Sequence, residues 1–145
     1  MDAICCKKYF STKEITFASV DTTGDRRALR ESGLSLPHNH LDIQLEFRGH
    51  GDKIGMATLA GELIHISYHD MKENFPTSLH KCWDRKPLCQ TSIDYAAVDG
   101  YLSYELYSRV QTMKDSLGPS WLDKLLPLRK KSKGTLDNLI SVFDH

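Results

Sequence analysis

The sequence feature that most constrains the fold is a long helical pattern over residues 91–109, which read TSIDYAAVDGYLSYELYSR. Thr91 followed three residues later by Asp94 is similar to a capping box and predicts that the helix begins there. Apolar and small residues recur at helical spacing at positions 93, 97, 100, 104 and 107, and they predict a buried face. Because Ala97 and Gly100 are small, we expect this helix to lie close against a sheet.

Two polar residues of this helix point to chemistry. Tyr95 and Asp99 are four positions apart, so a helix projects them in nearly the same direction, one turn apart. A hydroxyl and a carboxylate then share one patch of surface. Such pairs occur in many helices as solvated edges, so the pair alone does not define a site. Its meaning depends on the segment WDRKPL at residues 83–88, a short distance upstream.

The two segments WDRKPL at 83–88 and YAAVD at 95–99 together resemble the third motif of the DEDDy 3′–5′ exonucleases, a family of the RNase H-like superfamily that includes the Werner-syndrome-type exonuclease domain and many plant members. In that family a Trp and a Pro-Leu precede Tyr-Ala-Ala-x-Asp at this spacing. The resemblance covers about residues 13–112. It implies a metal-dependent hydrolase that acts on nucleic acids from the 3′ end.

A strand-turn-helix unit is predicted nearer the N-terminus. Residues 15–20 (ITFASV) have strand composition, residues 21–24 (DTTG) form a turn, and a helix runs from Asp25 to a stop at Gly33. By position alone, Asp25 is an acid that complements the helix dipole. The unit also resembles the second exonuclease motif, Gly-Asp-x-x-x-Leu, with Gly24, Asp25 and Leu29 as its matching residues.

The remaining patterns complete the predicted fold. Apolar and polar residues alternate over 41–47, which predicts a short strand that continues into a helix. Asp42 in this segment matches an acidic strand residue of the family, and we assign it no catalytic role. Residues 55–63 are predicted to form a core helix. The fold class is therefore predicted as α/β: a truncated RNase H-like fold, a mixed sheet flanked by helices with the first strands missing. We expect an N-terminal segment (1–14), a partial exonuclease domain (15–112) and a helical and basic tail (113–145).

The resemblance implies two-metal chemistry with Mg²⁺ or Mn²⁺, in which two cations about 4 Å apart activate water and stabilise the leaving oxygen. Asp99 would be a direct ligand of the first metal, Asp25 would hold the second through water, and the Tyr95 hydroxyl would orient the attacking water. The family supplies two further carboxylates from an Asp-x-Glu, and no Asp-x-Glu occurs in this sequence. We therefore expect weak or no turnover, on either DNA or RNA.

Composition leaves other possibilities open. The net charge is zero and no apolar run reaches the roughly 20 residues of a membrane helix, so we expect no membrane partner and only local contacts with nucleic acid. Four cysteines without a CxxC pair are typical of reduced thiols in the nucleus or cytoplasm.

One alternative to an active exonuclease is an inactive remnant that binds nucleic acid or protein, or associates with itself through an exposed sheet edge. A zinc-binding regulatory domain built on the histidines, with His65 and His69 four residues apart, and on the cysteines is the least supported alternative. The basic run 129–133 is a nuclear address, a phosphate-binding tail or a solvated linker.

Overall fold

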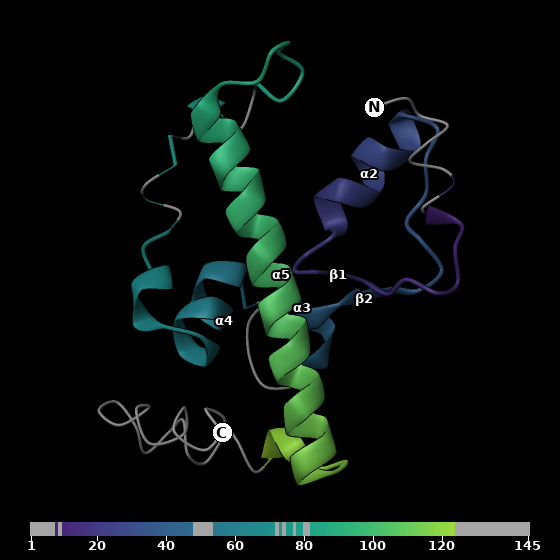
Figure 1. The fold of residues 1–145 in the computed structure, drawn as a ribbon, viewed down its shortest axis with the longest axis vertical. Coiled ribbons are helices and arrows are strands. Elements are labelled where there is room, and N and C mark those ends of the chain that lie inside the picture. Colours follow the sequence, from purple (N-terminus) through teal and green to yellow (C-terminus); the bar gives the residue numbers. More distant parts are fainter. Residues whose placement is uncertain are drawn as a thin grey trace. The chain divides into compact units, whose positions relative to one another are not determined.

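The computed structural model describes residues 8, 10–47, 54–71, 73, 75–76, 78–79 and 82–123. The chain divides into two compact units, Met1–Gly55 and Met56–His145, each of which is described by itself. Helices and a small parallel sheet make up the described residues, which confirms the α/β class (Figure 1). Most of the predicted N-terminal segment 1–14 and the basic run 129–133 lie outside the described residues.

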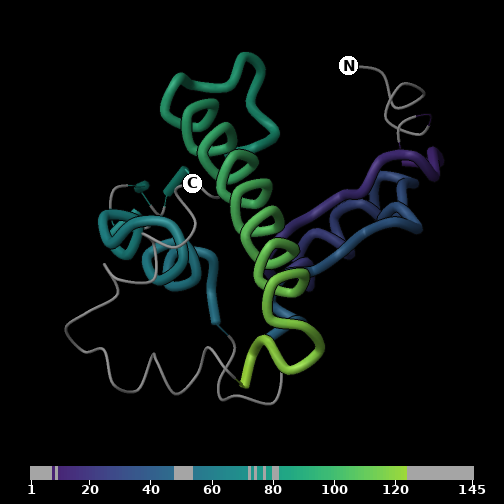
Figure 2. The backbone as a smooth tube through the Cα atoms, turned by 60° about the horizontal axis from the view of Figure 1, so that its bottom comes forward, coloured from purple at the N-terminus to yellow at the C-terminus, as the bar shows by residue number. Residues whose placement is uncertain are grey.

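The first unit contains a strand-helix-strand arrangement. Strand β1 (Phe17–Ser19) is followed by helix α2 (Thr23–Glu31), strand β2 (His40–Asp42) and the short helix α3 (Ile43–Glu46). The strands are parallel, with Ser19 opposite Asp42, and Figure 2 shows them running side by side. The predicted strand-turn-helix and strand-into-helix segments are confirmed, and α2 is followed by Gly33 at a φ of 69°, a conformation that favours glycine.

The Asp42 carboxylate joins the C-terminal ends of the two strands. It accepts hydrogen bonds from the backbone N–H of Asp21 (3.1 Å) and Thr22 (3.1 Å), from the Thr22 hydroxyl (3.0 Å), and from the N–H of Gln44 at the start of α3 (3.1 Å). Burial opposes ionisation of Asp42, but these hydrogen bonds outweigh it and lower the pKa of the carboxyl. Asp42 therefore holds the turn that leads into α2, where Asp21 adopts a φ of 57°.

The second unit is built around a long helix. It contains α4 (Met56–Leu63), the 3₁₀ turn η1 (Ile66–Tyr68) and α5 (Gln90–Leu117), and α4 packs against α5 (Figures 1 and 2). Apolar side chains from both helices form the buried core, namely Met56, Ala57, Leu59 and Ala60 of α4 with Leu102, Leu106, Val110 and Met113 of α5. The predicted core helix 55–63 is confirmed. No helix of the described residues is long and apolar enough to span a membrane.

Helix α5 differs from its prediction in three ways. It extends to Leu117, and it begins after Cys89 without a side-chain cap, so the predicted capping box at Thr91 is wrong. The predicted buried face is also wrong, since Ile93 is 46% and Tyr104 65% exposed. The larger aliphatic side chains of the core just described recur at helical spacing on another face and continue past residue 109. Burying that face removes more apolar surface from water, and the tyrosine hydroxyls remain solvated.

Candidate functional site

Helix α5 places Tyr95 and Asp99 one turn apart, as the sequence predicts, and both residues are half-buried. Burial raises the pKa of the Tyr95 hydroxyl, and the negative charge of Asp99 raises it further. The carboxylate therefore lies close enough to Tyr95 to oppose formation of a phenolate. At neutral pH the pair offers a protonated hydroxyl, which can donate and accept hydrogen bonds, beside a carboxylate.

Three aromatic rings connect this pair to the upstream loop. The Phe75 ring stacks on Tyr95 with centroids 4.0 Å apart and on Trp83 with centroids 6.1 Å apart, and Trp83 lies 6.2 Å from Tyr95. Phe75 is 5% exposed, so it is the buried centre of the cluster. The loop containing Trp83 and the helix residue Tyr95 therefore lie together in the second unit. Phe75 was not anticipated from the sequence, because no local pattern marks a stacking partner 20 residues away.

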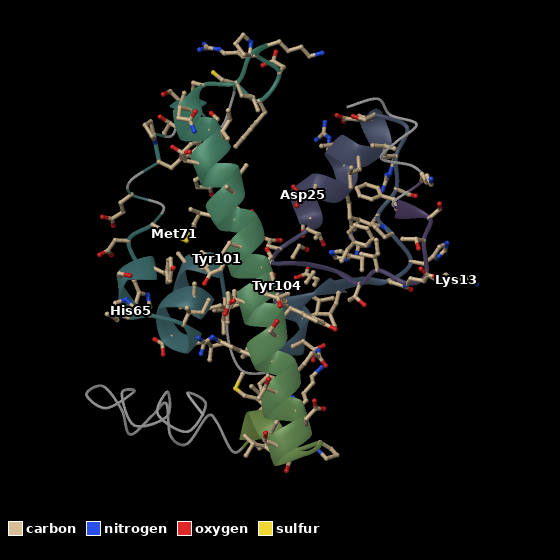
Figure 3. All side chains as sticks on the ribbon, viewed as in Figure 1. Lys13, Asp25, His65, Met71, Tyr101 and Tyr104 are labelled. Carbon is tan, nitrogen blue, oxygen red and sulfur yellow. The ribbon has the colours of Figure 1, made fainter. Side chains whose placement is uncertain are left out.

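Asp25 lies in the first turn of α2, where Figure 3 labels it, and its side chain is exposed. An acid at this position favours the helix because the N-terminal end of the helix dipole is positive. The structure thus brings Tyr95 and Asp99 together within the second unit, and it describes Asp25 within the first.

The two predicted metal ligands are described in different units of the chain. Mg²⁺ and Mn²⁺ prefer several oxygen ligands, and the predicted set supplies Asp25 in one unit and Asp99 in the other. Among the described residues no group of three or more His, Cys, Asp and Glu side chains gathers at one point.

The two histidines of the zinc alternative each have local contacts. His65 precedes η1, where its Nδ1 lies 2.8 Å from the Ser67 hydroxyl and accepts a hydrogen bond from the Ser67 N–H (3.3 Å). His69 Nε2 lies 3.8 Å from Glu62 Oε1. The His69 ring also packs on Gly61, where an added Cβ would come within 2.5 Å of the ring. Both side chains thus organise the segment that follows α4.

A cavity in the first unit contains a polar pair that the sequence did not reveal. Its volume is about 440 Å³, and its lining includes Phe17, Leu29, Asp25 and the hydrogen-bonded pair Ser19 and His40. The Ser19 hydroxyl lies 2.7 Å from His40 Nε2, and burial lowers the pKa of His40. His40 follows Pro37 and Asn39 in the sequence, and the pairing of β2 with β1 brings it to Ser19.

Comparisons of the chain with protein-family models, with curated proteins and with solved structures find no match. A functional assignment therefore depends on the motif residues of this chain and on their geometry.

Proposed function

We propose that this chain is a DEDDy-type 3′–5′ exonuclease domain with an RNase H-like ancestry, directed at the 3′ ends of DNA or RNA in the nucleus or cytoplasm, and with weak or no turnover by itself. The observation that carries the proposal is the Tyr95 and Asp99 pair, which α5 places one turn apart with both residues half-buried. The ring contact between Tyr95 and Trp83 supports it, because these residues come from the two segments of the third motif.

The chemistry of the pair is compatible with hydrolysis of a phosphodiester. A protonated tyrosine hydroxyl can orient a water by hydrogen bonding, and a carboxylate can hold a hard cation. In a complete site, Mg²⁺ or Mn²⁺ would activate the water and stabilise the leaving oxygen. Weak turnover follows because Asp25 and Asp99 give only two negative charges, which do not balance two divalent cations bound beside a phosphate.

The test is a nuclease assay on a 5′-labelled single strand with Mn²⁺. Asp25→Ala, Asp99→Ala and Tyr95→Phe are compared with two controls, Asp115→Ala and Tyr104→Phe, which change the same chemical groups at exposed positions of α5. We expect faint or no laddering from the 3′ end, and any laddering should disappear in the three site variants and persist in the controls. Laddering that survives in Asp99→Ala would contradict the assigned roles.

Binding of Mn²⁺, followed by electron paramagnetic resonance, tests the same site without requiring turnover. The exonuclease proposal expects weak binding that Asp99→Ala reduces further and Asp115→Ala leaves unchanged. Absence of both laddering and Mn²⁺ binding would overturn the proposal and leave the second candidate.

That second candidate is an inactive module that binds nucleic acid or another protein. Two observations favour it. The described sheet has two short strands, so β1 and β2 each have an outer edge whose backbone groups can pair with a partner strand. Helix α5 also leaves large apolar side chains in solvent, with Ile93 46% and Tyr101 52% exposed (Figure 3 labels Tyr101). Concentration-dependent self-association in size-exclusion chromatography would support the protein-binding form.

A further inference from the structure

Trp83 is an aromatic residue that the fold supports from one side and leaves accessible. Its ring is nearly parallel to that of Phe75, with 21° between the planes, and Phe75 in turn stacks on Tyr95. Trp83 nevertheless remains 42% exposed. A large ring held by stacking contacts and open to solvent is a preorganised platform, because another flat molecule can stack on it without first ordering it.

The residues that follow Trp83 add positive charge beside the ring. Arg85 and Lys86 are both exposed, and the single acid between them and the ring, Asp84, leaves the loop with a net charge of +1. The backbone N–H of Arg85 donates to the Cys82 carbonyl (3.3 Å), which closes a turn over residues 82–85 that contains Trp83. A ligand that offers both a flat ring and a negative charge matches this arrangement.

We propose that Trp83, Arg85 and Lys86 form a binding site for unpaired nucleotides of a single-stranded nucleic acid. A base stacks on the indole, and the adjacent phosphates contact the two basic side chains. Stacking favours single strands, since the base faces of a duplex are already covered by neighbouring bases. The proposal rests on the proposed function and deepens it, because Trp83 lies 6.2 Å from Tyr95 and a strand docked there runs beside the candidate catalytic pair.

The experiment measures binding of the full chain to a fluorescein-labelled strand of about 12 nucleotides, within the 4–16 nucleotides that one single-strand-binding domain covers. Fluorescence anisotropy is recorded in EDTA, so that neither metal nor cleavage contributes, with DNA and RNA strands in parallel. The variants are Trp83→Ala and Trp83→Phe. Tyr104→Ala is the matched control, because it removes an exposed aromatic ring from the same unit.

We expect Trp83→Ala to weaken binding about tenfold, Trp83→Phe to keep most of the affinity, and Tyr104→Ala to change it less than about twofold. Arg85→Ala and Lys86→Ala should each reduce the slope of log affinity against log salt by about 0.7, the value for one phosphate contact on a single strand. Duplex of the same sequence should bind more weakly than the single strand.

Three results would overturn the inference: no binding of the single strand, equal losses in Trp83→Ala and Tyr104→Ala, or duplex binding as tight as single-strand binding. Circular dichroism of each variant excludes unfolding as the cause of a loss. The outcome is separable from the proposed activity. If the protein binds the single strand through Trp83 but shows neither laddering nor Mn²⁺ binding, the exonuclease function is refuted and this binding site stands. If Trp83→Ala binds the strand normally and its laddering is unchanged, only this binding site is refuted.

Discussion

Replacing Asp42 with alanine tests how the first unit holds the turn between β1 and α2. The Asp42 carboxylate accepts four hydrogen bonds, from Asp21, Thr22 and Gln44. It is 9% exposed, and the residues that donate to it include Thr22 at 2% and Gln44 at 8% exposed. Water can therefore replace the lost acceptor only poorly. We expect the turn, and with it the first turn of α2 that carries Asp25, to lose its order.

The expected cost follows from the donors that remain buried. A buried donor left without an acceptor costs about 1–3 kcal/mol, and the lost cap of α3 alone costs about 1 kcal/mol. The four bonds share one carboxylate and are not additive. With two of the donor residues almost fully buried, the total is about 3–5 kcal/mol. That is a large part of the roughly 5–15 kcal/mol that stabilises a typical domain.

Asp42→Asn separates the charge from the shape. The pKa of Asp42 is lowered in the folded state, so its contribution to stability is present above the unfolded pKa of about 3.9 and is lost as the pH falls through the folded pKa. The asparagine variant keeps an acceptor oxygen but has no such titration. We expect it to be less destabilised than Asp42→Ala near pH 7, and to lose less stability than the wild type does below about pH 4.

The assay combines urea unfolding with amide hydrogen exchange at Asp21, Thr22 and Gln44. In Asp42→Ala these three amides should exchange faster than in the wild type, by about two orders of magnitude or more if the loss reaches 3 kcal/mol. The control is Asp115→Ala, which removes an exposed carboxylate from α5. A free energy of unfolding within about 0.5 kcal/mol of the wild type, with unchanged exchange at Thr22, would refute the reasoning.

Two further predictions concern the second unit. Gly61→Ala should destabilise the chain by about 1 kcal/mol, because the new Cβ displaces the His69 ring. In a His69→Ala background the same substitution should stabilise the chain by up to about 1 kcal/mol, because alanine has the higher helix propensity. Equal effects on the free energy of unfolding in urea in both backgrounds would contradict the contact between Gly61 and His69. Asp99→Asn should lower the pKa of Tyr95, followed as the phenolate absorbance that Tyr95→Phe removes. Because folding raises the pKa of Tyr95, its contribution to stability should be complete below about pH 10 and should decline as the pH rises through the folded pKa. An unchanged Tyr95 titration in Asp99→Asn would rule out the coupling between the two residues.

Local patterns predicted most of the elements in this chain, because strand composition, helical spacing and glycine stops act over a few residues. The strand at 17–19, the helix that ends before Gly33 and the helix that starts at Met56 are examples. The buried face of α5 was not predictable in the same way. Two apolar patterns compete along that helix, and the choice between them depends on packing against α4, which is distant in sequence.

In the candidate site, too, the contacts set by local helix geometry were predictable and those set by long-range packing were not. The proximity of Tyr95 and Asp99 follows from helix geometry, so the sequence was sufficient for it. The stacking of Phe75 with Tyr95 and the hydrogen bond between Ser19 and His40 depend on a loop path and on a strand register, and neither has a sequence signal. The joint role of Asp25 with Asp99 stays a prediction, since it requires an arrangement of the two units.

Binding of a single strand and its cleavage should depend differently on salt and on Mn²⁺, so the two proposed activities can be measured separately. Contacts of Arg85 and Lys86 with phosphates weaken as salt rises, because counterions compete for the same charges. The hydroxyl of Tyr95 stays protonated through neutral pH whatever the salt, since burial and Asp99 both raise its pKa. Cleavage additionally requires carboxylates to offset the charge of the cations, so it is limited by acids and not by affinity for the strand. A chain that binds single strands at low salt yet cleaves nothing at any Mn²⁺ concentration would therefore support the proposed site at Trp83 and leave the proposed exonuclease activity without support.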